Sequence, residues 1–201
     1  QFILVIIFFI IFKLLGPNLS SQFSGKIFEI IGPIFRSKKI IHENIKRAIP
    51  EINPQDLQKI VKSMWNNYGN IFAEYMFIKN FRKGNLSSKI IVDGQEILDE
   101  IKKNKKQVVF ISGHFNNFEL MAMHIEKSGI NLAAVYRPLN NYFLNPLMER
   151  IRRKYICKKQ IKKGISGTKE LLKNFKDGSS IALMIDQRVS EGINSEFFNQ
   201  K

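Results

Sequence analysis

The amino-acid sequence predicts an α/β protein, in which a mixed, largely parallel sheet is flanked by helices and preceded by a membrane-anchor helix and a further helical segment. From residue 89 onward, short apolar runs of strand length alternate with segments of helical period, as in strand–helix–strand units. Polar residues stand directly after several of these runs. Before residue 89, the apolar residues recur at helical spacing or fill one continuous run.

The alternating pattern predicts where each strand and helix of the sheet region lies. Strands are expected at 89–92, 107–111, 131–136 and 180–185, and helices at 95–103, 117–127, 144–154 and 167–175. His114, Arg137 and Asp186 follow three of these strands. Because the carboxyl ends of parallel strands meet at one edge of a sheet, we expect these three side chains to lie close together.

The first residues predict a membrane anchor. Residues 2–12 are apolar on every face, a run shorter than the roughly 20 residues that cross a bilayer. The chain begins with Gln rather than Met, so we expect residues 1–15 to be the remainder of an anchor helix with a basic cytoplasmic flank. A buried core helix is the alternative.

Helices are also predicted between the anchor and the sheet. Segments 20–31 and 37–49 alternate apolar pairs with basic residues, a pattern typical of helices that lie on an anionic membrane surface. Pro54 opens a long helix to about Ile78, whose apolar stripe is expected to be core. The sequence therefore divides into an anchor (1–15), an amphipathic helical region (16–82) and an α/β core (83–201).

Composition limits the function. The chain has 201 residues, enough for one main domain, and a net charge of +15 that indicates an anionic partner. No recognisable nucleic-acid-binding motif accompanies this charge, so nucleic acid is not expected as that partner. Cys157 is the only cysteine, which excludes an intrachain disulfide and a cysteine zinc cluster.

His114 and Glu119 are the candidate catalytic pair. Positions five apart on one helix differ by about 140°, so the two side chains can meet only if His114 lies in the turn before the helix. A carboxylate there would orient the imidazole, whose other nitrogen would take a proton from an attacking hydroxyl. The helix start, with Asn116 and Asn117, would add backbone donors beside it.

A basic stretch follows between Arg150 and Lys163, where every charged residue is positive. It is either an ordinary solvated face or a docking surface for phosphates or an acidic helix. Its members are Arg150, Arg152, Arg153, Lys154, Lys158, Lys159, Lys162 and Lys163.

Three blocks of the sequence together resemble a known family. They are Gly113–Glu119, Val135–Asn141, and Gly178 with the strand that leads to Asp186 and Gln187. In this order they look like the late acyltransferases of lipid A biosynthesis, the lauroyl and myristoyl transferases. That family belongs to the glycerolipid acyltransferase superfamily with its His-x-x-x-x-Asp/Glu motif. The anchor, the segment 44–51 and the long helix fit as well.

The resemblance implies transfer of a fatty acyl group from acyl carrier protein to a hydroxyl of a lipid A precursor, at the cytoplasmic face of the inner membrane. It implies neither a cofactor nor a metal. Members usually continue beyond the pair Phe197 and Phe198, so we expect this chain to be a fragment truncated at both ends.

The resemblance also assigns residues. The family's catalytic histidine and carboxylate correspond to His114 and Glu119, and its essential arginine falls near Arg152 or Arg153. Asp186 matches the aspartate before glutamine, here Gln187. We expect Arg137, these arginines, Asp186, Gln187, Asn116 and Asn117 to bind substrate or stabilise an oxyanion.

Other functions remain open. A lysophospholipid acyltransferase typically has Asp in place of Glu119 and a Glu-Gly-Thr-Arg block, which this chain lacks. A mannoside acyltransferase, a hydrolase with Ser112 as nucleophile, a metal site that includes His124, and a non-catalytic basic membrane-binding protein are the further alternatives. The last would not need His114, Arg137 and Asp186 gathered at strand ends.

Overall fold

The structure is a computed structural model that describes residues 1–187 and residue 196. Phe197 and Phe198 therefore lie outside the described residues. The elements, in chain order, are α1 (Phe2–Phe35), α2 (Lys38–Ala48), α3 (Pro54–Glu74), the 3₁₀ helix η1 (Tyr75–Phe77), α4 (Ile78–Lys83), the 3₁₀ helix η2 (Ser87–Lys89), α5 (Gln95–Lys103), β1 (Val109–Ser112), α6 (Glu119–Lys127), β2 (Leu132–Tyr136), α7 (Leu144–Tyr155), β3 (Lys159–Lys162), α8 (Ile165–Lys176) and β4 (Ser180–Met184).

The four described strands form one parallel sheet in the order β1-β4-β2-β3. The α/β class is thus confirmed. The last strand in sequence, β4, lies inside the sheet, between β1 and β2. It aligns Ser112 of β1 with Met184. All four strands point their carboxyl ends to the same edge, where the polar residues that follow them gather.

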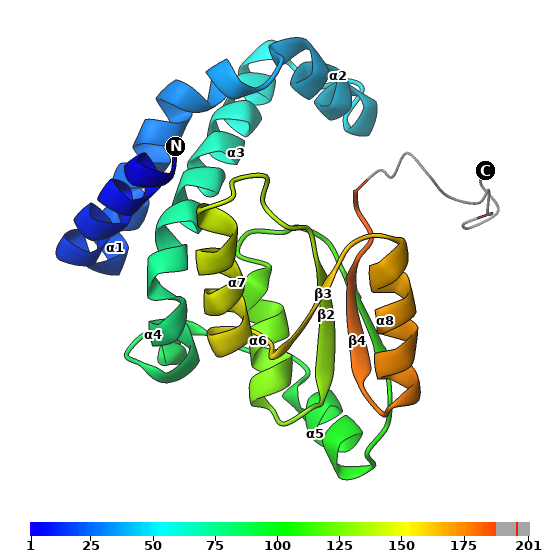
Figure 1. The fold of residues 1–201 in the computed structure, drawn as a ribbon. Helices are drawn as coiled ribbons and strands as arrows, with labels where there is room; N and C mark the ends of the chain where they lie inside the picture. The colour runs from blue at the N-terminus through cyan, green and yellow to red at the C-terminus, as the bar shows by residue number, and fades with distance from the viewer. Residues whose placement is uncertain (188–195, 197–201) are drawn as a thin grey trace.

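Helices cover both faces of this sheet. α6 and α7 lie on one side, and α8 lies on the other (Figure 1). The main core fills the first side, where Met123 of α6, Leu132 of β2 and Ile156 after α7 are buried together. On the other side, the backbone of α8 approaches β3 so closely that a Cβ at Gly167 would lie 1.6 Å from the carbonyl oxygen of Lys162.

The apolar helix α1 consists of two arms. Gly16 interrupts it with φ 75° and ψ 172°, and Pro17 follows. Phe8 in the first arm and Phe28 in the second both contact the ring of Phe72 in α3, at 6.2 and 5.7 Å between centroids. Twenty residues of straight helix span about 30 Å, so the arms must lie side by side. The expected helix 20–31 is part of the second arm.

Length and composition single out α1 among the described helices as able to cross a membrane, which suggests a membrane anchor. Only 11% of its most apolar window is buried. Large apolar side chains are exposed along both arms, among them Leu4, Leu14 and Ile34. An exposed apolar surface of this kind is typical of a helix that contacts lipid.

The long helix α3 forms as predicted. Asn53 caps it, since its Oδ1 accepts a hydrogen bond from the backbone N–H of Asp56 at 2.9 Å, and Pro54 occupies the first turn. The chain then continues through η1 and α4 with little change of direction (Figure 1). This continuation brings Tyr75 against the sheet core.

One strand prediction is wrong, and one strand was not predicted. Residues 89–92 form no strand, and Ile91 is 93% exposed. The segment does not pair with β1, which lies at the edge of the described sheet and pairs only with β4. Conversely, Lys159–Lys162 of the basic stretch is the strand β3. Gln160 and Ile161 are buried, so this part of the stretch is not simply a solvated face.

Candidate active site

His114 and Asp186 form an ion-pair geometry at the carboxyl edge of the sheet. The Nδ1 of His114 lies 2.7 Å from Oδ1 of Asp186, and the backbone N–H of His114 donates to Oδ2 at 2.8 Å. The strand register explains this contact. Ser112 is aligned with Met184, and His114 and Asp186 each follow one of these two residues by two positions. The predicted clustering of these two residues is therefore present.

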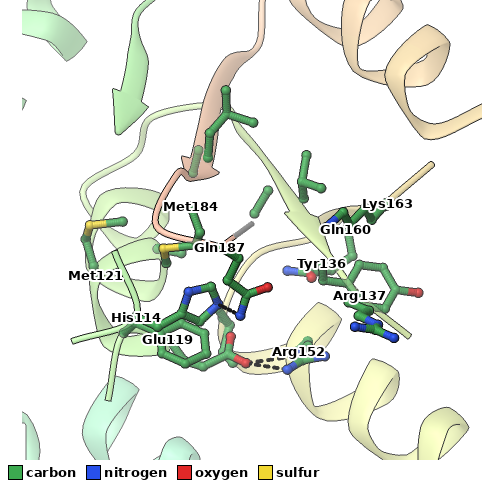
Figure 2. A pocket seen from close by; sticks show the side chains of 17 residues that line it. His114, Glu119, Met121, Tyr136, Arg137, Arg152, Gln160, Lys163, Met184 and Gln187 are labelled. Atoms are coloured by element: carbon green, nitrogen blue, oxygen red, sulfur yellow. Dashed lines mark hydrogen bonds and ion pairs between the residues drawn. The ribbon is translucent and has the colours of Figure 1, made fainter. Parts of the chain in front are cut away.

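The pairing determines which ring nitrogen of His114 is available. Asp186 can only accept while ionised, so Nδ1 carries the hydrogen and Nε2 keeps its lone pair. Nε2 lies 3.4 Å from the amide nitrogen of Gln187, and the ring of Phe118 packs edge-on at 4.6 Å between centroids. Figure 2 shows the imidazole beside the Gln187 amide. An acceptor nitrogen facing a cavity is the arrangement that a general base requires.

Glu119 is not the hydrogen-bond partner of His114, contrary to expectation. Its Oε1 accepts from Nε of Arg152 at 2.8 Å and forms an ion pair with Nη2 at 2.7 Å. The Tyr75 hydroxyl also donates to Oε1. Glu119 is the first residue of α6 and faces α7 and η1, whereas β4 supplies a carboxylate nearer the imidazole.

Arg152 connects this buried cluster. Its Nε also donates to the Tyr75 hydroxyl at 2.9 Å, and its guanidinium lies 5.6 Å from the centroid of the Tyr136 ring. Burial by itself would lower the pKa of Arg152, but the negative charge of Glu119, the interaction with Tyr75 and the hydrogen bonds to both together outweigh it and raise that pKa. Burial, together with the charge of Glu119, raises the pKa of the Tyr75 phenol well above its ordinary value. Arg152 therefore stays a cation and Tyr75 a neutral donor.

A cavity of about 340 Å³ joins the two clusters. His114, Glu119, Arg137, Arg152 and Gln187 line it, together with Lys163 (Figure 2). Tyr136 and Gln160 add two further polar side chains, and the rest of the wall is apolar, formed by Phe118, Met121, Ala122, Ala134, Val135, Ile156, Ala182, Leu183 and Met184. Positive side chains beside an apolar wall fit a molecule with an anionic or polar end and a hydrocarbon part.

The other expected site residues lie elsewhere. Arg153 is exposed and does not line this cavity, so the structure distinguishes it from Arg152. Asn116 and Asn117 line a separate groove against α3.

His124 pairs with Gln95 at 2.6 Å, and the described residues hold no group of three His, Cys, Asp or Glu that could bind a metal. Ser112 bonds only to the carbonyl of Gly113, not to His114.

Sequence reasoning missed two tyrosines of the site. Tyr75 was assigned to a helical core stripe, and nothing in its local sequence distinguishes it from the apolar residues of that stripe. Tyr136 belonged to a predicted strand; its hydroxyl donates to Glu149, and burial with this bond raises the pKa of Tyr136 to about 12. Polar aromatics buried beside ionised groups become visible only once the fold brings them together.

The fold and the site together define a class: an α/β protein with a histidine–aspartate pair at a strand end, a buried arginine–glutamate cluster and a partly apolar cavity. A comparison with protein families identifies the chain more closely, because residues 1–201 match the family described as bacterial lipid A biosynthesis acyltransferase. The chain belongs to this family. Its acceptor is accordingly a lipid A precursor. A comparison with curated proteins gave no match.

The Asp186 contact predicts a pH-dependent contribution to stability. The hydrogen bonds from the backbone and then the ring of His114 lower the pKa of Asp186. A depressed carboxyl pKa in the folded state stabilises the protein above the ordinary aspartate range, and this contribution is lost as the pH falls through the folded-state pKa. In urea unfolding from pH 7 to pH 3, Asp186→Asn should be less stable than wild type at pH 7, with the difference shrinking below about pH 4. A constant difference would contradict the assignment.

Proposed function

We propose that this acyltransferase moves a fatty acyl group from a thioester of acyl carrier protein to a hydroxyl of the lipid A precursor, with His114 as general base. The observation that carries this proposal is the Nδ1 contact of His114 with Asp186, which leaves the lone pair of Nε2 at the cavity, with only the long 3.4 Å contact from the Gln187 amide. In this mechanism Asp186 orients the imidazole. Glu119 acts through Arg152 rather than on the imidazole directly.

The chemistry needs no covalent enzyme intermediate, because a thioester is already an activated acyl donor. The acceptor hydroxyl gives its proton to Nε2 of His114 as its oxygen attacks the thioester carbonyl carbon. The resulting oxyanion collapses, the carbon–sulfur bond breaks, and the leaving thiolate takes the proton back from His114. The products are an ester and the free thiol of the carrier.

Arg152 is the candidate oxyanion stabiliser. Its Nη1 is buried and has no hydrogen-bond partner among the described residues, although the other guanidinium nitrogens are engaged. An unpaired buried donor costs about 1–3 kcal/mol, and developing negative charge at the cavity would supply the missing acceptor. Glu119 and Tyr75 hold the guanidinium in place, so the donor is fixed before the reaction begins.

The surrounding charges suit both substrates. Arg137 and Lys163 line the cavity and would attract phosphate groups. Arg153, Lys154 and Lys158 are exposed on and just after α7, where an acidic carrier protein would find complementary charge. The apolar surface of α1 would hold the site at the inner membrane, on its cytoplasmic face, where the acyl carrier protein resides.

An assay of the full chain with purified acyl carrier thioester tests this function. In mixed micelles, mass spectrometry should show the lipid A precursor gaining one acyl group and the carrier appearing as free thiol in equal amount. Lysophosphatidic acid and an acylated mannoside serve as comparison acceptors and should be acylated at least about tenfold more slowly. Equal or faster transfer to either of them, or transfer that requires acyl-CoA, would overturn the assignment of acceptor or donor.

A further inference from the structure

A second concave site lies on the other side of the loop that carries His114. It is an open groove of about 410 Å³ between α3 and the segment that joins β1 to α6. One wall is a single face of α3, formed by Asn67, Asn70, Ile71 and Glu74, whose spacing of three and four residues puts them on one side of the helix. The other wall is formed by Phe115, Asn116, Asn117 and Leu120.

The polar groups of this groove are only partly used. Asn117 links the two walls by donating from Nδ2 to Oε2 of Glu74 at 2.8 Å. Its Oδ1, however, is buried with no hydrogen-bond partner in the described part of the chain. The carboxamides of Asn67 and Asn116 have no hydrogen-bond partner within residues 1–187 and 196 either. A buried amide oxygen without a donor costs free energy, so the groove is incomplete until a ligand or water supplies one.

The chemistry of the lining restricts the ligand. The chain has a net charge of +15, yet among the described residues no Lys or Arg lines this groove, and Glu74 is its one ionisable side chain. A phosphate would meet a carboxylate there and no counter-charge. Carboxamides instead suit hydroxyl and amide groups, since each offers both donors and an acceptor. Phe115 is 77% exposed and adds an aromatic ring, against which the apolar face of a pyranose can pack.

The position of the groove relative to His114 favours the acceptor, rather than the acyl donor, as its ligand. Asn116 and Asn117 follow His114 by two and three residues, so a molecule bound in the groove lies across one loop from the imidazole. The same α3 packs with Trp65, Gly69 and Phe72 against α1, the candidate anchor. The groove is therefore built on the helix that also meets the membrane-facing element.

From these observations we infer that the groove binds a neutral amino-sugar ring of the acceptor headgroup through its hydroxyl and N-acyl amide groups. This inference rests on the proposed function, because it takes the acceptor to be bound while its hydroxyl is acylated at His114. An amide N–H of the ligand satisfies Oδ1 of Asn117. Ring hydroxyls pair with Asn67 and Asn116, and the phosphates of the acceptor stay outside, toward Arg137 and Lys163 of the first cavity.

Two variants remove a carboxamide without disturbing the backbone. Asn67→Ala keeps a helix-forming residue at a position with no side-chain hydrogen bond to lose. Asn116→Gly suits the φ of 42° that Asn116 adopts, since glycine enters the left-handed region without strain. Asn174→Ala on α8 is the matched control, because this carboxamide donates only to the backbone of its own helix.

The first measurement is steady-state kinetics with the lipid A precursor varied. Each groove variant should raise KM for the precursor about five- to tenfold, as expected for one lost hydrogen bond, and leave KM for the acyl carrier thioester within twofold of wild type. The Asn174→Ala enzyme should match wild type in both values. An unchanged KM for the precursor in both groove variants would overturn the inference while leaving the acyl transfer itself established.

The second measurement does not depend on turnover. Saturation-transfer NMR with N,N′-diacetylchitobiose, a soluble amino-sugar disaccharide, should show binding to wild type and to Asn174→Ala, weakened at least about fivefold in Asn67→Ala and Asn116→Gly. Inorganic phosphate should not compete. If the enzyme acylates no lipid A precursor but the sugar still binds in this way, the proposed function fails and the sugar site stands. Absent or variant-independent sugar binding removes the site.

Discussion

Replacing His114 with alanine is expected to lower kcat for acyl transfer about a thousandfold, the loss typical of a missing general base. The side chain of His114 is 30% exposed and its hydrogen bonds join one loop to one strand end, so the fold should remain. The measurement is the initial rate of ester formation at saturating precursor and carrier thioester, with circular dichroism as the check on folding.

Matched variants separate the roles at this site. Asp186→Asn keeps the size of the side chain and should lower kcat less than His114→Ala, because it removes only the charge that fixes the imidazole tautomer. His42→Ala on α2, which changes a partly buried histidine outside this site, serves as the control histidine variant. Transfer by His114→Ala within tenfold of wild type would exclude the base assignment.

Replacing Glu119 with alanine is expected to lower the free energy of unfolding by about 3–5 kcal/mol, because it leaves a buried guanidinium and a buried phenol without their acceptor. The Glu119 and Arg152 side chains are only 8% and 13% exposed. Urea denaturation followed by circular dichroism measures the change. The Glu100–Lys106 pair is the exposed counterpart, so Glu100→Ala should cost less than about 1 kcal/mol.

The double variant Glu119→Leu with Arg152→Met tests whether an unpaired buried charge causes the loss of stability in Glu119→Ala. Removing both charges leaves no uncompensated ion, so much of the stability lost in Glu119→Ala should return, although transfer activity should not. Equal stability of wild type and Glu119→Ala would show that the pair is not buried as described.

The sheet and the gathering of His114 and Asp186 at one of its edges could be predicted from the sequence for the same reason. Apolar runs of strand length mark the strands, and parallel strands place the residues that follow them at one edge. His114 and Asp186 each stand two residues beyond the aligned pair Ser112 and Met184, so the contact between them follows from the pairing of β1 with β4.

The hydrogen-bond partners of His114 and Glu119 could not be predicted from the sequence. The spacing of His114 and Glu119 permits a contact between them but does not require one. In the structure His114 pairs instead with Asp186, which follows β4, and Glu119 pairs with Arg152 in α7. Tyr75 gave no signal, because a tyrosine in a helical stripe is usually core. Likewise β3 was hidden in a basic run, where lysines flank the buried Gln160 and Ile161.

The central place of β4 has a consequence for biosynthesis. β1 and β2 do not pair with each other, so the sheet cannot close until residues 180–184 have left the ribosome and inserted between them. Up to that moment the nascent polypeptide carries the imidazole of His114 but not the aspartate with which it pairs. Its apolar first helix emerges long before, so the chain can reach the lipid phase while still catalytically silent.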